Sequence, residues 1–436
     1  MTEDSGKTHG RALFLFWISS VFLAVAYGIY AQQAEVFPYQ VIVEAGRGLR
    51  AVRAKLTGAP PGGYNAMPED PPARIERASG AHPGLTMVTR RAADMRSAIT
   101  VMSMDGQTEH EWVVDWFELW PDADHVYEEF RPRDRTGAFI HGAVLREDGS
   151  VVFNFEYLGL TCLREDGSVA WKLPYATHHS VHEQADGVLW VSGRELQSEP
   201  DERYPMYLPG EYVETVLKIS SEGQVLRKWE VRQLLIESGY EGLLHTRLGT
   251  DKLHLNDVEP FPQEMEPGFF GPGDIVVSLR NVSTVFVFNE SSGKIKWLVA
   301  GPFANQHDPD FTDGNSVTVF DNYTIANVRG GINGSHYQSR IVRVTAPENE
   351  VDVLFAGTPE QPFFTGMGGK HQVLPNGNLL LTEWRAGRIL EVTPDGEIAW
   401  EFNNVLEDGL IGRMHQAERL PASYAEVFQA DAAAED

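Results

Sequence analysis

Short apolar runs separated by turn residues fill the chain from His82 to about Leu420. Runs such as Val151–Phe155, Asp274–Leu279 and Leu379–Glu383 have the length and composition of β-strands. The dipeptides between such runs are often Asp-Gly, Asn-Gly or Ser-Gly, which are typical of hairpin turns. The pattern therefore predicts a domain built from strands throughout.

Two features recur in this pattern. Near the end of most units, a glycine-containing turn is followed by a tryptophan, as in Asp166-Gly167 with Trp171 and Asp395-Gly396 with Trp400. Repeats of ~40–50 residues with four strands each are typical of β-propellers. Counting the units predicts a six-bladed β-propeller. Each unit begins with a histidine before an apolar strand, and these histidines are His141, the His178/His179/His182 cluster, His254, His307, His371 and His415.

The two ends of the repeat region complement each other. His415 begins a sixth unit, but the chain after it is too short for three further strands. The segment from Leu85 to Val114 has such strands and lacks a histidine at its start. We therefore expect the last strand to join the first blade and to hold the two ends of the propeller together.

A run without charged residues, from Ala12 to Ala31, precedes the repeats. It matches the ~20 residues that cross a bilayer as a helix. Lys7 and Arg11 before it favour a cytoplasmic N-terminus, and the run favours an uncleaved signal anchor over the alternative, a cleaved signal peptide. In both cases we expect the bulk of the chain outside the cytoplasm, in the periplasm or the extracellular space.

These patterns predict five segments. They are a cytoplasmic N-terminus (1–11), a transmembrane signal anchor (12–31), a juxtamembrane segment with a Pro/Gly-rich linker (32–81), the propeller (82–425) and an acidic tail (426–436).

Charge and cysteine content exclude several classes of function. The formal net charge is −26, without a basic stripe, so a nucleic-acid partner is not expected. The one cysteine, Cys162, excludes an internal disulfide framework and a cysteine-rich metal site. A site for an anion on such an acidic chain must be locally positive.

Propeller geometry supplies such a site. A histidine at the start of each innermost strand lies at one rim of the central channel, and the second strand of each blade returns to the same rim. Arginines stand where those second strands end, namely Arg90/Arg91, Arg194, Arg280 and Arg385, with Arg329 in a longer loop. A histidine in a repeat can also simply hold a turn. The residues around the histidines nevertheless differ from unit to unit, which indicates that some of them carry chemistry.

The residues at these positions resemble the bacterial arylsulfotransferase family. The resemblance lies in His254-Leu255-Asn256-Asp257-Val258, Ser278 to Ser283, His307 to Asn322, Ser339 to Val342 and His371 to Asn378. It implies transfer of a sulfuryl group from an aryl sulfate ester to a phenolic acceptor. It also implies a sulfohistidine intermediate and no nucleotide sulfate donor. We expect neither a cofactor nor a bound metal.

The resemblance also implies roles for individual residues. His254 and His307 match the first two histidines of the family's site, and His371 is the candidate for the sulfated nucleophile. Arg329 is the residue available for the family's site arginine, although more residues separate it from Asp321-Asn322 than the family's pattern has. We expect Arg280, Arg385, Asn256 and Asn322 to bind the substrate.

Two alternatives remain open at this point. The propeller can be a membrane-anchored binding or scaffold module without catalytic activity. Several histidines around a channel can also hold zinc or iron, as in a metalloenzyme, although only His178, His179 and His182 show a short ligand spacing.

Overall fold

The structure is a computed structural model that describes residues 4–33, 37, 41, 58–246, 249–323, 338–407, 409–425 and 427–428. The chain divides into two compact units, Met1–Pro61 and Gly62–Asp436. Arg329, one of the predicted site residues, lies outside the described residues, as does almost all of the expected acidic tail (426–436).

The first unit contains one long helix, α1 (Asp4–Gln33). Its segment Leu13–Ala31 has a mean hydropathy of 2.0 over 19 residues, and its large apolar side chains are exposed. A helix of this length and composition can cross a membrane, and a signal sequence has the same properties. The apolar run predicted at Ala12–Ala31 thus forms a helix that is a candidate for a membrane anchor.

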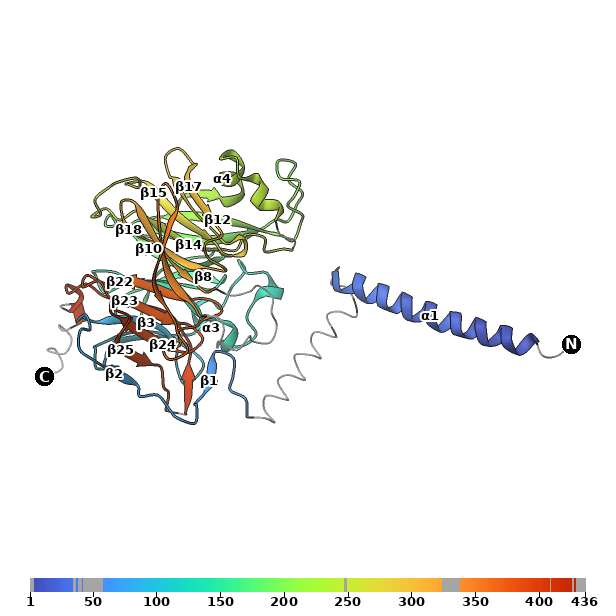
Figure 1. Cartoon of the computed structure of the whole chain (residues 1–436), viewed down its shortest axis with the longest axis horizontal. Coiled ribbons are helices and arrows are strands. Elements are labelled where there is room, and N and C mark those ends of the chain that lie inside the picture. The colour runs from blue at the N-terminus through green and yellow to red at the C-terminus, as the bar shows by residue number, and fades with distance from the viewer. Residues whose placement is uncertain are drawn as a thin grey trace. The chain divides into compact units, whose positions relative to one another are not determined.

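The described strands of the second unit form six sheets of four or five strands and one two-stranded sheet (Figure 1). Each large sheet is a propeller blade, and the innermost strands of the six blades contact one another in a closed ring. From the inside outward, blade 1 contains β27 (Met414–Arg419), β3 (Thr86–Arg91), β4 (Ser97–Met102) and β5 (Thr108–Val114). Blade 2 contains β6 (Ile140–Leu145), β7 (Val151–Phe155), β8 (Gly159–Leu163) and β9 (Val169–Leu173). Blade 3 contains β10 (Thr177–Glu183), β11 (Leu189–Leu196), β12 (Tyr212–Ile219) and β13 (Val225–Glu230).

The remaining blades have the same order. Blade 4 contains β14 (Leu255–Pro260), β15 (Asp274–Leu279), β16 (Thr284–Asn289) and β17 (Lys294–Ala300). Blade 5 contains β18 (His307–Asp313), β19 (Ser316–Asp321), β20 (Arg340–Thr345) and β21 (Glu350–Ala356). Blade 6 contains β22 (Lys370–Val373), β23 (Leu379–Glu383), β24 (Arg388–Val392) and β25 (Ile398–Asn403). Short helices occupy the connections: α3 (Trp116–Leu119), η1 (Glu128–Phe130), η2 (Arg135–Gly137), α4 (Val231–Glu237), η3 (Glu241–His245) and η4 (Arg280–Val282).

The last strand closes the ring, as the sequence predicted. β27 pairs antiparallel with β3, with Met414 opposite Arg90 and Arg419 opposite Thr86. The amide of Gln416 strengthens the closure, because it both donates to and accepts from the backbone of Ala143 in blade 2, at 2.9 Å each way. The fold is therefore the predicted six-bladed β-propeller, preceded by one apolar N-terminal helix.

Two short strands lie before His82, within the segment expected to be a linker. β1 (Tyr64–Ala66) pairs with β26 (Leu410–Gly412), and β2 (Ile75–Arg77) adds a fifth strand to the outer edge of blade 6. Such pairing uses main-chain hydrogen bonds at a free edge, so it needs few apolar side chains. The propeller unit accordingly begins at Gly62.

The repeated tryptophans join neighbouring blades. The indole N–H of Trp112 donates to the carbonyl of Arg164, that of Trp171 to Ser221, and that of Trp400 to Met104. Each acceptor belongs to the turn of the next blade, and Trp297 donates similarly to the side chain of Asn349. The turn-and-tryptophan repeat is thus an interblade contact.

The innermost strands begin with a β-bulge in five of the six blades. The register shifts after Met414, Ile140, His178, Leu255 and His307. β22 lacks such a shift, and His371 pairs regularly with Leu381. Because a bulge redirects the side chains next to it, the histidine of blade 6 does not occupy the position of the other five.

Candidate active site

Five imidazoles from five blades gather at the start of the innermost strands. The ring centroid of His179 lies 4.0 Å from that of His141, 5.1 Å from that of His254 and 6.1 Å from that of His307. His415 lies 6.0 Å from His141. These five residues form what we call the histidine cluster. The convergence predicted from the repeat therefore exists, but without His371.

Glu156 places a buried carboxylate in the histidine cluster. Its Oε2 accepts a hydrogen bond from Nδ1 of His141, and its Oε1 lies 3.8 Å from Nδ1 of His179. Burial alone raises the pKa of Glu156, but the charge and hydrogen bond of His141 outweigh burial and lower this pKa to about 2. Glu156 directly follows β7, the second strand of blade 2. It therefore occupies the strand-end position at which the sequence predicted arginines in other blades.

Three members of the histidine cluster are held neutral. Burial, reinforced by neighbouring positive charges, moves the pKa of His179, His307 and His415 well below the usual value of histidine. Neutral imidazoles offer a lone pair for bond formation or for accepting a proton.

Asn322 fixes the tautomer of His307. Its Oδ1 lies 2.6 Å from Nδ1 of His307, and its Nδ2 donates to the carbonyls of Thr365 and Gly368. An amide oxygen can only accept, so Nδ1 of His307 carries the proton and Nε2 accepts from the backbone N–H of Gly368 at 3.3 Å. Asn322, expected to bind substrate, thus has its amide committed to holding His307.

His254 is paired with a carboxylate on one nitrogen only. Its Nδ1 lies 2.6 Å from Oδ2 of Asp251. Burial raises the pKa of Asp251, but the hydrogen bond and charge of His254 lower it overall, so the carboxylate is ionised. Within the described part of the chain, Nε2 of His254 has no hydrogen-bond partner. His254 has a φ of +56°, and its carbonyl accepts from the backbone of Arg280.

The predicted arginines lie in different surroundings. Arg280 donates from Nε and Nη2 to Oδ1 of Asn281, and its charge contributes to the low pKa of both His307 and Asp251. Arg385 contacts Met367 and lies 5.8 Å from the ring of Trp384. Arg90 forms an ion pair with Glu111, and buried Arg91 donates to backbone carbonyls. Of the two predicted site arginines that the structure describes, Arg280 and Arg385, it is Arg280 whose charge lowers the pKa of a clustered histidine.

His371 lies in a second polar layer of the channel. Its side chain is fully buried, with Nδ1 3.0 Å from Oδ2 of Asp308 and Nε2 2.8 Å from Oγ1 of Thr318. Although burial opposes it, the charges of Asp310 and Asp308 raise the pKa of His371. Both ring nitrogens of His371 therefore have partners within the protein.

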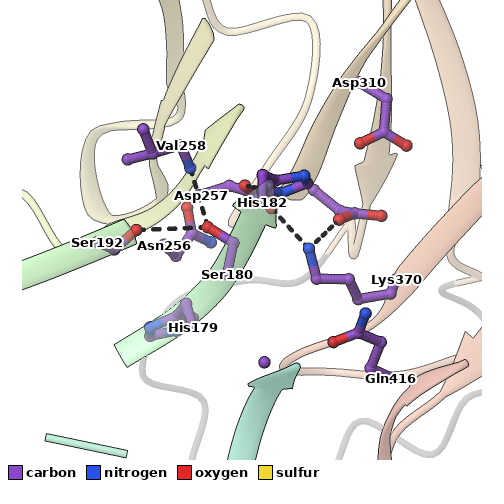
Figure 2. A network of polar contacts seen from close by, with 12 residues as sticks. His179, Ser180, His182, Ser192, Asn256, Asp257, Val258, Asp310, Lys370 and Gln416 are labelled. Atoms are coloured by element: carbon purple, nitrogen blue, oxygen red, sulfur yellow. Dashed lines mark hydrogen bonds and ion pairs between the residues drawn. The ribbon is translucent and has the colours of Figure 1, made fainter. Parts of the chain in front are cut away.

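Lys370 neutralises the acids of this layer. Its Nζ lies 3.0 Å from Oδ2 of Asp257 (Figure 2) and 2.5 Å from Oδ1 of Asp308. Nε2 of His182 lies 3.3 Å from the other carboxylate oxygen of Asp257, Oδ1. Nearby, Asn256 donates from its buried amide to the carbonyl of Gln306 at 2.7 Å.

Two groups have a geometry that suits a metal ion. One ligand atom each from His141, Glu156 and His179 lie within 4.8 Å of one another, and so do ligand atoms of Asp308, Asp310 and His371. In both groups protein cations or N–H groups already contact the carboxylates. The ligand atoms that a metal ion would need are present, but hydrogen bonds and ion pairs within the protein already involve them.

An aromatic cavity of about 590 Å³ adjoins the histidine cluster. Glu156 and Tyr157 belong both to the wall of the cavity and to the surroundings of the cluster, since Glu156 accepts a hydrogen bond from His141 and the ring of Tyr157 lies 6.4 Å from that of His179. The other aromatic side chains of the wall are Tyr127, Phe130, Phe139, Tyr175 and Tyr212. Sequence patterns did not indicate this cavity, because its walls combine connections between blades with the ends of strands β11 and β12.

These features define a six-bladed β-propeller with a polar, histidine-rich site at one end of its channel. The chain belongs to the arylsulfotransferase family, whose sequence model, described as "Arylsulfotransferase (ASST)", matches residues 143–405. The match spans blades 2 to 6 and includes three of the five clustered histidines, His179, His254 and His307, while His141 and His415 lie outside it.

Solved structures with a similar fold have low sequence identity to this chain. A protein of unknown function from Bacteroides caccae is 13% identical, with a TM-score of 0.48, over 76% of this chain and 98% of that protein. Virginiamycin B lyase from Staphylococcus aureus is 14% identical, with a TM-score of 0.35, over 60% of this chain and 69% of the lyase. Hydrazine synthase from Kuenenia stuttgartiensis is 12% identical, with a TM-score of 0.42, over 68% and 71%. No curated protein matches the sequence.

Proposed function

We propose that this protein transfers a sulfuryl group from an aryl sulfate ester to a phenolic acceptor through a sulfohistidine intermediate, without a nucleotide sulfate donor. Membership of the arylsulfotransferase family supports this type of reaction. The observation that carries the proposal is the state of His254. Its Nδ1 is held by the ionised carboxylate of Asp251, and its Nε2 has no hydrogen-bond partner among the described residues.

In the first half of the reaction, Nε2 of His254 attacks the sulfur of the aryl sulfate. A bond from nitrogen to sulfur forms as the bond from sulfur to the phenolic oxygen breaks, and the phenolate leaves with the electron pair. Asp251 stabilises the positive charge that develops on the imidazole. The guanidinium of Arg280 stabilises the negative charge on the sulfate oxygens.

In the second half, a phenolic acceptor replaces the departed phenolate. Neutral His179, whose ring lies 5.1 Å from that of His254, accepts the phenolic proton. The acceptor oxygen then attacks sulfur, the bond from nitrogen to sulfur breaks, and His254 regains its lone pair. Neither half of the reaction requires a metal or a nucleotide.

The proposal assigns the nucleophile to His254 rather than to His371, the residue expected from the resemblance. His371 is fully buried, and both of its ring nitrogens already contact protein oxygens. A nucleophile needs a free lone pair within reach of the substrate. We propose that His371, with Lys370, instead fixes the strands beneath the histidine cluster.

We further propose that α1 anchors the protein to a membrane and that the propeller works outside the cytoplasm. The apolar segment Leu13–Ala31 supports the anchoring. Lys7 and Arg11 before it support the orientation.

A labelling experiment tests the nucleophile. The purified full chain is exposed briefly to a chromogenic aryl sulfate without nucleotide or acceptor, and its peptides are then weighed. We expect the peptide that contains His254 to gain the mass of one sulfuryl group. His254→Gln should abolish both the label and the release of phenol. The control is His245→Gln, because the His245 side chain is 56% exposed on η3.

Other outcomes would change the proposal in defined ways. A label on the peptide with His371 or with His307 would move the nucleophile to that residue. If no peptide gains mass and no phenol is released with any phenolic acceptor, the protein binds aryl sulfates at most, as a binding or scaffold module would.

A further inference from the structure

The aromatic cavity beside the histidine cluster contains a sandwiched guanidinium. The Cζ atom of Arg194 lies 3.2 Å from the ring centroid of Tyr157 and 3.7 Å from that of Tyr212. Both faces of the guanidinium are therefore covered by aromatic rings, which holds the group in one plane. Its edge, which carries the N–H groups, is the part left for other partners.

No protein group takes that edge in the part of the chain that the structure describes. Arg194 has no carboxylate within ion-pair distance and no side-chain hydrogen bond there. A guanidinium that is fixed by stacking and lacks an acceptor is a preformed donor for an anion. Arg194 is also close enough to Asp251 for its charge to lower the pKa of that carboxyl, which places it near His254.

The acidic residues of the cavity wall already have hydrogen-bond donors within the protein. Glu195 accepts hydrogen bonds from the hydroxyl of Tyr175 at 2.8 Å and from Nζ of Lys228 at 2.6 Å. Glu156 accepts a hydrogen bond from His141. The repulsion that these carboxylates would exert on an anionic ligand is thus reduced.

The size of the cavity indicates the size of its ligand. Its volume of about 590 Å³ falls within the ~300–1,000 Å³ that is typical of pockets for drug-sized ligands. A single phenol ring would leave much of this space to water. The aromatic walls favour a ligand with two or more rings, because stacked and edge-on ring contacts need extended π surfaces.

We propose that this cavity binds aromatic anions of at least two rings, with the anionic oxygen on the edge of Arg194 and the rings between the aromatic walls. This inference rests on the proposed function, since it identifies the cavity as the aryl subsite of the sulfuryl-transfer site. It makes Arg194 a residue that determines specificity, and the chain a transferase for polycyclic phenols over simple ones.

Binding of a ligand that cannot react tests this inference separately from catalysis. The probe is 2-naphthalenesulfonate, whose sulfur is bonded to carbon and cannot be transferred, titrated calorimetrically into the full chain in detergent micelles. We expect 2-naphthalenesulfonate to bind more tightly than benzenesulfonate. We also expect that inorganic sulfate does not compete with 2-naphthalenesulfonate for binding. Arg194→Gln should weaken binding by about tenfold or more, the value of a charge-assisted hydrogen bond.

Two further variants separate a local from a global effect. Arg227→Gln is the matched control, because Arg227 also stacks on an aromatic ring, at 4.5 Å from Trp229, but on the outer strand of blade 3. It should bind the probe like the wild type. Leu196→Trp narrows the cavity from its wall and should weaken 2-naphthalenesulfonate more than benzenesulfonate.

Each outcome decides the inference. If Arg194→Gln and Leu196→Trp bind 2-naphthalenesulfonate as tightly as the wild type, or if benzenesulfonate binds equally well, the inference is wrong. Turnover of a simple aryl sulfate would then still leave the proposed function standing. If the probe binds as expected but no aryl sulfate is turned over, the cavity is confirmed and the proposed function fails.

Discussion

The Nδ1 atom of His254 lies 2.6 Å from the Oδ2 atom of Asp251. The backbone carbonyl of Asp251 is in turn held by the side-chain amide of Asn281 at 2.8 Å. A carboxylate at Nδ1 fixes the proton there and leaves the lone pair on Nε2. This contact distinguishes His254 from His371, whose two nitrogens both have partners.

Replacing Asp251 should slow sulfuryl transfer without unfolding the propeller. Asp251→Asn keeps an acceptor at the same place but removes the charge that stabilises the sulfated imidazole. We expect kcat for a chromogenic aryl sulfate to fall by about 10²-fold or more. Glu241→Gln is the control, because Glu241 pairs with His245 at 3.9 Å on the surface. Equal rates for the Asp251→Asn variant and the wild type would contradict the role of the pair.

The buried neutral imidazole of His179 should make stability depend on pH. Burial and neighbouring charges hold the pKa of His179 well below its value in the unfolded chain. The unfolded state then binds the proton more readily, so this contribution to stability is present above pH ~6.5 and is lost as the pH falls toward the folded pKa. Relative to His179→Gln, the wild type should lose up to ~1.4 kcal/mol per pH unit in this range.

Denaturant unfolding at pH 7.5 and pH 5.5 measures this difference. Acidic groups with raised pKa values, such as Asp310 and Glu418, act equally in both proteins and cancel in the comparison. His245→Gln, an exposed histidine, should follow the wild type at both pH values. A His179→Gln variant with the same pH dependence as the wild type would show that the imidazole is not held neutral.

The fold was largely predictable from the sequence, because five of the six blades repeat the same turn and tryptophan. Closure through β27 followed from a strand count that left His415 without a blade of its own. The position of His371 was not predictable. Five inner strands carry a bulge near their histidine and β22 does not, and a bulge depends on backbone register rather than on residue type. The cavity at Arg194 also escaped prediction, since it joins connections that are far apart in sequence.

Removing metal ions should leave sulfuryl transfer unchanged. The carboxylate of Glu156 is hydrogen-bonded to His141, and the ammonium group of Lys370 contacts Asp308 at 2.5 Å. Both donor groups that suit a metal therefore have internal partners. We expect dialysis against a chelator to leave the rate unchanged and elemental analysis of the purified chain to find no stoichiometric metal. Loss of activity on dialysis, restored by zinc or iron, would instead support a metalloenzyme.

The tryptophan contacts between blades should contribute unequally to stability. Trp400→Phe removes an indole N–H that donates to Met104 in blade 1 at 2.9 Å, leaving a buried carbonyl without this partner. We expect a loss of ~1–3 kcal/mol in the free energy of unfolding. Trp229→Phe is the matched variant, because its indole N–H has no partner among the described residues, and it should cost less. Equal losses would mean that ring size, and not the hydrogen bond, explains the repeat.

Lys370 should stabilise the channel in a way that depends on pH. Lys370→Met leaves the buried carboxylates of Asp257 and Asp308 without their shared cation, which typically costs ~3–5 kcal/mol. Lys370 contributes to the lowered pKa of Asp257, so without it this carboxyl should take up a proton more easily. The variant should therefore regain part of its stability relative to the wild type as the pH falls from 7 toward 5. Denaturant unfolding measures this, with Lys218→Met, which removes a half-buried surface ion pair to Glu290, as the control. If Lys370→Met loses the same free energy of unfolding at pH 7 and at pH 5, then the packing of the lysine side chain, and not its charge, holds the layer together.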